Sequence, residues 1–184
     1  AVNALAAELE RTMLNKAILS VSNLVGTDGT PPGAILDFLT ANERIYQNLV
    51  PEDDRLLALI NPATNTKTVD ARKGLFQSSE EIAKQYENGY IGMGEGFNYL
   101  RSNLLPTLTT GTATGAITVT TTSVNGATTI ALTGTGTQTL KAGQVFTVAN
   151  RFDVHPLTKQ TQANLHQFVI LNDVTAVAGA FTGV

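Results

Sequence analysis

The sequence of 184 residues lacks cysteine altogether and carries little charge. Without cysteine the chain has no disulfide, no thiolate metal site and no cysteine nucleophile, although this absence assigns no compartment. Only 15% of the residues are charged, the net charge is −3 and the isoelectric point is near 5.3. This balance argues against binding nucleic acid by neutralising its phosphates. No run of about 18 apolar residues is present, so we expect no transmembrane helix and no membrane partner.

A secretory signal and an initiating methionine are also missing. Glu8, Glu10, Arg11 and Lys16 interrupt the apolar residues near the start, which is not typical of a signal peptide. The chain begins at Ala1, directly in a helical pattern, so we expect it to come from the interior of a longer chain. Its length suits one substantial domain or two small ones, and a compact domain of this size buries roughly 70% of the unfolded surface.

Residues suited to catalysis are few. His155 and His166 are the only histidines, and one precedes a proline while the other lies in an apolar strand pattern. No G-x-S-x-G elbow and no H-E-x-x-H or H-x-H spacing occurs. The sequence does not exclude a catalytic pair of carboxylates on opposite walls of a cleft, although the second half contributes only Asp153 and Asp173. We therefore expect no enzyme, and we assign no catalytic, cofactor-binding or metal-binding residue.

Two local patterns invite a ligand-binding interpretation. Glu52-Asp53-Asp54 is the densest acidic cluster, but consecutive side chains point in different directions and no histidine lies nearby, so we favour a solvated turn. The glycines of Gly92-Met93-Gly94-Glu95-Gly96 do not follow the G-x-G-x-x-G pattern, and no Walker lysine follows them. We interpret these glycines as backbone freedom in an extended connector.

The first quarter of the chain predicts two helices. Apolar residues recur every three or four positions from 2 to 25, which predicts one long amphipathic helix of about 36 Å ending before Gly26. A second amphipathic helix is expected over 33–49 and is stopped by Pro51. The apolar stripe of the first helix consists of Val2, Leu5, Leu9, Met13, Ala17, Val21 and Leu24.

The next segment predicts a buried strand. Residues 56–60 are a continuous apolar run closed by Asn61-Pro62, which suits a strand covered on both faces. A helical turn is expected near 68–73.

A short helix and a connector complete the first half. Ser78 and Glu81 offer a capping box for a helix over 79–88. The alternation of glycine with bulky residues predicts an extended connector over 90–105. This connector leads from the charged, helical half into a second half of different composition.

Residues 107–184 predict a threonine-rich β domain, in which Lys141 is the only charged residue before Arg151. Asn125-Gly126 predicts a two-residue hairpin turn, because both residues tolerate a positive φ. Short strands separated by turns favour a small antiparallel barrel or sandwich, with a low-complexity stalk as the alternative. We expect this domain to be incomplete at its C-terminal end. The expected strands lie at 117–120, 130–132, 144–149 and 165–171.

Five segments of the sequence are distinctive. Three of them are Arg55–Thr64 (RLLALINPAT), Gly74–Ala83 (GLFQSSEEIA) and Leu140–Val148 (LKAGQVFTV), and two shorter ones are Gly96–Tyr99 and Leu105–Thr107. Together they resemble the major coat proteins of short-tailed phages of the P22 type. The resemblance covers residues 55 to 171 and contains no catalytic motif. Family coat proteins are substantially longer than this chain, which agrees with the expectation that the chain is part of a larger one.

This resemblance implies an α+β protein with the tailed-phage capsid fold of the Hong Kong 97 type. Residues 1–106 would form the capsid core, with 2–25 as its long spine helix, and residues 107–184 would form an inserted small antiparallel β-barrel domain. The implied function is a structural subunit whose hexamers and pentamers build an icosahedral shell around double-stranded DNA. Scaffolding protein and portal are the implied partners, and the implied location is the virion after assembly in the host bacterial cytoplasm.

A binding module is the alternative from another class. A β-rich domain of a phage fibre or a surface adhesin, recognising carbohydrate or a host surface, would account for the threonine-rich half. It would not account for the long amphipathic helix or the apolar strand at 56–60. The aromatic residues of the second half that could read a sugar are Phe146, Phe152, Phe168 and Phe181.

Overall fold

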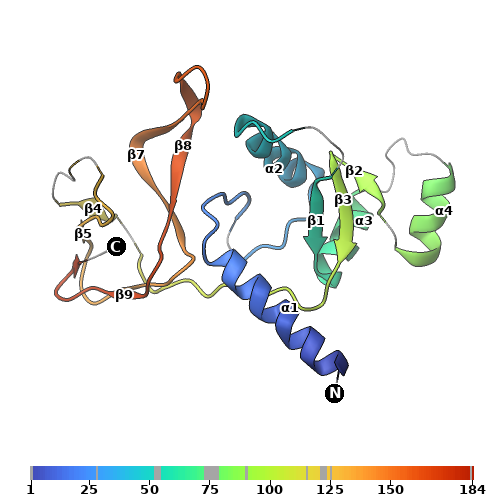
Figure 1. Ribbon diagram of the computed structural model, residues 1–184, viewed down its shortest axis with the longest axis horizontal. Helices are drawn as coiled ribbons and strands as arrows, with labels where there is room; N and C mark the ends of the chain where they lie inside the picture. Colours follow the sequence, from blue (N-terminus) through green and yellow to red (C-terminus); the bar gives the residue numbers. More distant parts are fainter. Residues whose placement is uncertain are drawn as a thin grey trace. The chain divides into compact units, whose positions relative to one another are not determined.

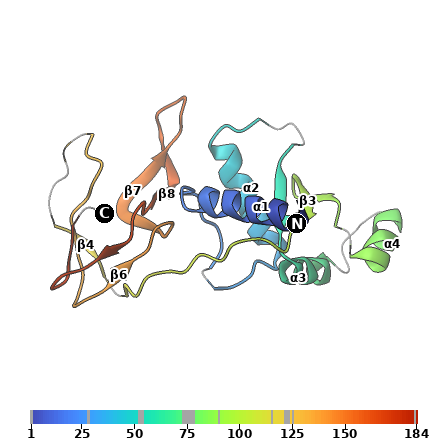
Figure 2. The same cartoon turned by 60° about the horizontal axis from the view of Figure 1, so that its bottom comes forward.

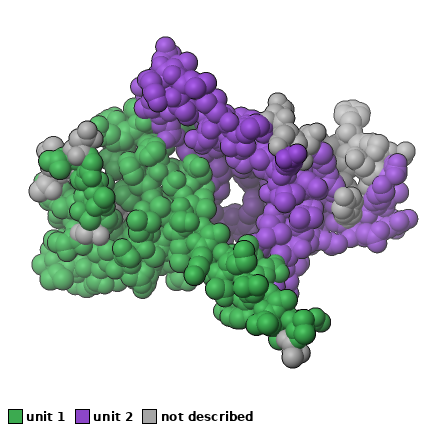
Figure 3. Space-filling view, viewed as in Figure 1, with its two compact units in different colours: residues 1–23, 106–152, 164–184 green, residues 24–105, 153–163 purple. Residues whose placement is uncertain are grey.

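The computed structural model describes the chain except residues 1, 28, 52–54, 73–78, 90, 115, 121–123, 125 and 183. It is a mixed α+β protein, and its contacts group into two compact units. Unit 1 comprises residues 1–23, 106–152 and 164–184, and unit 2 comprises 24–105 and 153–163 (Figure 3). The expected division at 106/107 into a capsid core and an insertion domain is a separate statement and stays a prediction.

Among its described residues, unit 2 contains three helices and one small sheet. The second expected helix is present, slightly shorter than 33–49, and the Asp37 carboxylate accepts hydrogen bonds from the N–H groups of Gly33 and Ala34 at its start. Its elements are α2 (Ile35–Gln47), β1 (Leu57–Ile60), α3 (Pro62–Arg72), α4 (Ser79–Asn88), β2 (Met93–Gly94) and β3 (Phe97–Arg101) (Figure 1).

Helix α3 occupies a segment for which the sequence predicted only a turn near 68–73. Asn61 accepts a hydrogen bond from the N–H of Thr64 through its side-chain oxygen, at 2.7 Å, and Pro62 is the first helical residue. This is the preferred chemistry of a helix start. Asn61-Pro62 therefore both ends the strand and begins a helix. Helix α4 has the expected bounds, whereas Ser78 of its proposed capping box lies outside the described residues.

The sheet of unit 2 has the strand order β1-β3-β2. β1 runs parallel to β3, with Ala58 opposite Tyr99, so the chain from β1 to β3 is a crossover that contains α3 and α4. The strand expected to be covered on both faces has one exposed face, because Leu57 and Leu59 are 61% and 38% exposed whereas Ile60 is buried. It also lies at an edge of the described sheet. Its continuous apolar run did not reveal that one face is uncovered.

The core of unit 2 is aromatic. Phe38 of α2 packs edge-on against Tyr99 of β3, with ring centroids 5.4 Å apart, and Phe97 lies 6.5 Å from the same ring. Ile60 and Ile91 complete the buried set. Such edge-to-face pairs add to the free energy of burial, and they place Tyr99 at the centre of the unit.

Unit 1 contains α1 (Val2–Ile18), which ends earlier than the expected residue 25. Figures 1 and 2 both show it as one straight helix. Its apolar stripe is mostly exposed, with Val2 80%, Leu5 73%, Leu9 61% and Met13 63% accessible, and α1 has no buried residue. The periodicity predicted the helix itself, but this face is not covered by the described part of the chain.

In the described residues, the remainder of unit 1 consists of loops and three small sheets. A three-stranded sheet has the order β10-β5-β4, and two-stranded sheets pair β6 with β9 and β7 with β8. Its strands are β4 (Thr118–Val119), β5 (Leu132–Thr133), β6 (Thr139–Leu140), β7 (Val145–Val154), β8 (Thr161–Val169), β9 (Val174–Thr175) and β10 (Ala180–Phe181), with the outer residues of the β7–β8 hairpin assigned to unit 2.

The hairpin predicted at Asn125-Gly126 agrees with the register of β4 and β5. Val119 lies opposite Leu132, which centres the connection on positions 125 and 126. The N–H of Ala127 donates to the carbonyl of Val124 at 3.1 Å, and Gly126 has φ +83°. Asn125 itself lies outside the described residues.

The β7–β8 hairpin contains one extra residue on β7. At its base the N–H of Gly143 donates to the Ile170 carbonyl, and the N–H of Ile170 donates to the Gln144 carbonyl. At its tip the N–H of His155 donates to the Gln160 carbonyl. The chain makes eleven steps from Gln144 to His155 but ten from Gln160 to Ile170. Asn150, with φ +61°, lies in the longer segment and marks a β-bulge.

The expected closed barrel is not present among the described residues. Alternating residues correctly predicted strands, but most ladders of unit 1 are only two residues long and the three sheets stay separate. Alternation fixes which side chains share a face, whereas closure depends on which edges pair, and that information is not local.

Phe181→Ala tests where the core of unit 1 lies. Phe181 is completely buried and packs with Leu132, Leu140 and Ile170. Removing its ring leaves a cavity, so we expect a loss of about 3–5 kcal/mol in unfolding free energy, measured by denaturant titration. Phe152→Ala, at a phenylalanine that is 42% exposed, is the matched control and should change the midpoint far less. Equal effects would contradict this core.

Candidate functional site

The structure contains no recognisable metal centre within its described residues. No group of three or more His, Asp or Glu side chains there could hold a metal ion. The acidic cluster Glu52-Asp53-Asp54 lies outside these residues, so its interpretation as a solvated turn stays a prediction. Among the described helices, none combines the length and apolar character needed to cross a membrane.

Both histidines have structural contacts. At the tip of the β7–β8 hairpin, Nδ1 of His155 accepts the N–H groups of Leu157 (3.3 Å) and Thr158 (3.1 Å). His166, on β8, packs edge-on against Phe168 with centroids 4.6 Å apart. The two rings therefore shape a turn and an aromatic cluster.

The glycines at 92–96 form a tight turn. Gly94 pairs with Phe97, so Glu95 and Gly96 are the two loop residues of the β2–β3 hairpin. Their φ values of +48° and +81° match a type I′ turn, which requires positive φ at both positions. The expected extended connector over 90–105 is thus corrected in part, because it contains a hairpin.

This turn presents a carboxylate to a buried cation. Glu95 accepts a charge-assisted hydrogen bond from Arg72 of α3 and another from the Tyr99 hydroxyl, at 2.7 Å. The side chains of Arg72 and Glu95 are 3% and 12% exposed. The Arg72 guanidinium also lies 4.6 Å from the centroid of the Tyr99 ring, in a cation–π contact. We call Arg72, Glu95 and Tyr99 the buried triad.

Two glycines make room for the buried triad. A Cβ on Gly94 would lie 3.1 Å from the Arg72 guanidinium. A Cβ on Gly96 would lie only 2.6 Å from Nδ2 of Asn42, which donates to the Glu95 carbonyl at 2.9 Å. Glycine at position 94 therefore avoids a tight contact with the Arg72 side chain. Glycine at position 96 avoids an overlap with the Asn42 side chain and also suits the positive φ there.

The buried face of α3 is polar, which sequence periodicity did not reveal. Its buried residues are Thr64, Asn65, Thr68 and Arg72. Thr68 is fully buried and bonds to the Thr64 carbonyl, while Asn65 donates to the Gly89 carbonyl at 3.3 Å. The spacing of these polar residues by three and four was the available signal, but apolar periodicity is the usual basis for assigning a buried face.

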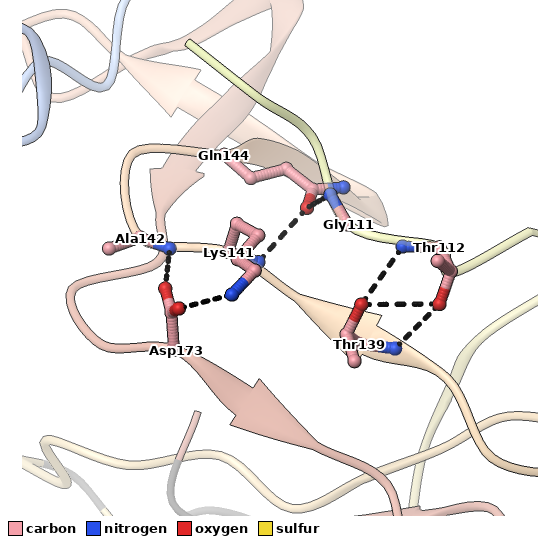
Figure 4. Close-up of polar contacts among 7 residues, drawn as sticks. All are labelled: Gly111, Thr112, Thr139, Lys141, Ala142, Gln144 and Asp173. Carbon is pink, nitrogen blue, oxygen red and sulfur yellow. Dashed lines mark hydrogen bonds and ion pairs between the residues drawn. The ribbon is translucent and has the colours of Figure 1, made fainter.

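Hydrogen bonds fasten the start of the β structure to strand β6 (Figure 4). The backbone N–H of Thr112 donates to the Thr139 hydroxyl at 3.1 Å, and the N–H of Thr139 donates to the Thr112 hydroxyl at 3.0 Å. The Gln144 side-chain oxygen accepts hydrogen bonds from the backbone N–H groups of Gly111 and Lys141. A Cβ on Gly111 would lie 1.9 Å from the Thr139 carbonyl oxygen, so this crossing needs glycine.

The turn after β6 is held by Asp173. Its carboxylate accepts the N–H of Ala142 at 2.9 Å and the Lys141 ammonium at 2.5 Å (Figure 4). These contacts hold the pKa of Asp173 below its ordinary value, first through the Ala142 N–H and then through Lys141. Gly143, with φ +83°, completes the turn. The arrangement is a fastened turn rather than a reaction centre.

An apolar cavity of about 440 Å³ opens within unit 1. Its wall includes the edge strand β4 and the first half of β7. No histidine and no carboxylate is among its lining residues, so the cavity presents apolar surface and no acid–base group. We name it the β cavity; its lining residues are Ile117, Thr118, Val119, Leu132, Leu140, Phe146, Thr147, Val148, Ala149 and Ile170.

Comparison with protein families decides what these features belong to. Residues 1–182 match the family model described as P22 coat protein, gene protein 5. The chain belongs to the P22 coat protein family. The resemblance predicted from the sequence is thereby confirmed, over a wider range than the five segments that carried it. No curated protein matches the sequence closely enough to serve as a relative.

Membership of a coat protein family identifies the class of function. The family is one of structural proteins of the phage capsid rather than of enzymes. The contacts described above, which stabilise turns and packing, agree with a structural class.

Glu95→Gln tests the buried triad. The substitution keeps the shape but leaves the buried Arg72 cation without its counter-charge, so we expect a loss of about 3–5 kcal/mol in unfolding free energy by denaturant titration. Glu43→Gln is the matched control, because Glu43 is exposed and bonds only to Gln47 across one helical turn. Its midpoint should stay that of the unmodified protein; a similar loss in both variants would refute a special role for Glu95.

Alkaline unfolding tests Tyr99. Burial raises its pKa above the ordinary 10.0, and the bond to Glu95 and that carboxylate's charge act in the same direction, while Arg72 opposes them. Below pH 10 the tyrosine is neutral in both the folded and the unfolded protein, so its full contribution to the free energy of unfolding is present. Above pH 10 the unfolded tyrosine ionises first, so the free energy of unfolding falls as the pH rises. Tyr99→Phe should flatten the alkaline limb of a stability–pH profile. Tyr86→Phe, at a residue 92% exposed, should leave it unchanged.

Proposed function

We propose that this chain is part of the subunit of an icosahedral phage head, which assembles into a shell enclosing double-stranded DNA. The observation that carries the proposal is the family match over residues 1–182. Hexamers and pentamers of the subunit would build the shell, with each contact modest and the sum large. Scaffolding protein and portal are the further partners, and the particle would assemble in the host bacterial cytoplasm before becoming the virion.

The proposed fold of the complete subunit is the Hong Kong 97 type. Helix α1 would be its spine helix, since its apolar stripe is exposed and needs a partner surface. Residues 1–106 would belong to the capsid core and 107–184 to an inserted β domain, open rather than barrel-shaped in the described residues. The low and slightly negative charge supports only non-specific proximity to packaged DNA.

The fibre or adhesin alternative finds little support in the aromatic residues of the β structure. Phe146 and Phe168 stack on each other at 5.5 Å, and Phe181 is fully buried. Phe152 is the partly exposed phenylalanine that remains in this set, at 42%. A sugar-binding surface normally presents aromatic faces to its ligand, and here most of these faces are occupied.

Electron microscopy tests the proposal. The protein, expressed at its natural full length together with its neighbouring phage genes, should yield closed shells of uniform diameter in negative stain. Small monodisperse particles, combined with specific binding on a glycan array, would contradict a shell subunit and favour the binding module.

A further inference from the structure

The tip of the β7–β8 hairpin presents an exposed leucine. Leu157 follows Pro156 in the loop between the two strands and is 75% exposed, and Val154 before it is 53% exposed. Leu157 is not among the residues that line the β cavity. Figures 1 and 2 show β7 and β8 side by side up to this tip.

The loop that carries Leu157 is held in one shape. The N–H of His155 donates to the Gln160 carbonyl and the N–H of Lys159 donates to the His155 carbonyl, both at 2.9 Å. The His155 ring accepts two further N–H groups from inside the loop, one of them from Leu157 itself. A loop that is ordered before binding loses little conformational entropy when it docks. His155 thus helps to fix the shape of the loop that carries Leu157.

The β cavity has the chemistry to receive such a side chain. Its lining is mostly aliphatic and aromatic, and its volume is about 440 Å³. An apolar cavity of roughly 150 Å³ already accepts a benzene-sized guest in preference to water. The β cavity therefore has room for a leucine side chain with part of the loop around it, and its wall at Val119 is 45% exposed and accessible.

We propose that Leu157 of one copy of the protein inserts into the β cavity of a second copy. This inference rests on the proposed function, which supplies the second copy. A projecting residue and a receiving cavity at different places on one chain make a head-to-tail contact, which closes into rings or extends through an array. The hairpin tip of one copy would supply the inserted side chain, and β4 with the first half of β7 would form the receiving wall of the cavity in the other.

A disulfide between copies tests the contact, because the 184 residues contain no cysteine to interfere. Any cysteine elsewhere in the full-length chain is replaced by serine in all variants. One variant carries Leu157→Cys and another Val119→Cys, each at full length, and the two are co-assembled, oxidised mildly and run on a non-reducing gel. We expect a dimer band at least tenfold stronger than with the control pair Val177→Cys and Val119→Cys. Val177 is 77% exposed, which matches the exposure of Leu157.

The outcomes separate this contact from the function it rests on. Closed shells together with a dimer band specific to the Leu157→Cys and Val119→Cys pair support the inference. Closed shells with no dimer band, or with equal bands from both pairs, overturn the inference and leave the shell function intact. If no shells form, the proposed function fails and the inference fails with it. As a second readout, Leu157→Asp should lower shell yield at least tenfold and Val177→Asp should not, with circular dichroism verifying that both variants fold. Normal yield from Leu157→Asp would also overturn the inference.

Discussion

The ion pair between Arg72 and Glu95 is the constraint on which unit 2 depends. It joins the end of α3 to the β2–β3 turn, across a separation of more than twenty residues, in a place where neither charge reaches water freely. A buried charge without its partner is costly, so the helix and the hairpin are stable in this arrangement only together. Tyr99 links the pair to the aromatic core through its hydroxyl and its ring.

The β part of unit 1 is stabilised differently, because it has short ladders and few charged residues. Threonine side chains provide the cross-links that longer strands would otherwise supply, as in the paired hydroxyls of Thr112 and Thr139. Asp173 and Gln144 fix the turn after β6, and Phe181 fills the centre. The resulting unit has a packed interior but leaves the β cavity open along a free strand edge.

A coat protein needs this combination of stiff parts and uncovered surfaces. The buried triad and the fastened turns make rigid bodies, while the apolar stripe of α1 and the tip at Leu157 stay exposed. Exposed apolar surface is a liability for an isolated monomer, yet it is the source of affinity when copies assemble.

Local rules determined much of this protein from sequence alone. Apolar spacing predicted α1 and α2, and the composition of residues 107–184 predicted β structure, because side-chain period and turn chemistry act within a few residues. The five segments that carried the resemblance were sufficient to identify the family. Tertiary structure decided the rest: that β1 lies at an edge, that α3 buries polar residues, and that Glu95 meets Arg72. Each of these depends on a partner distant in the chain, which no local pattern specifies.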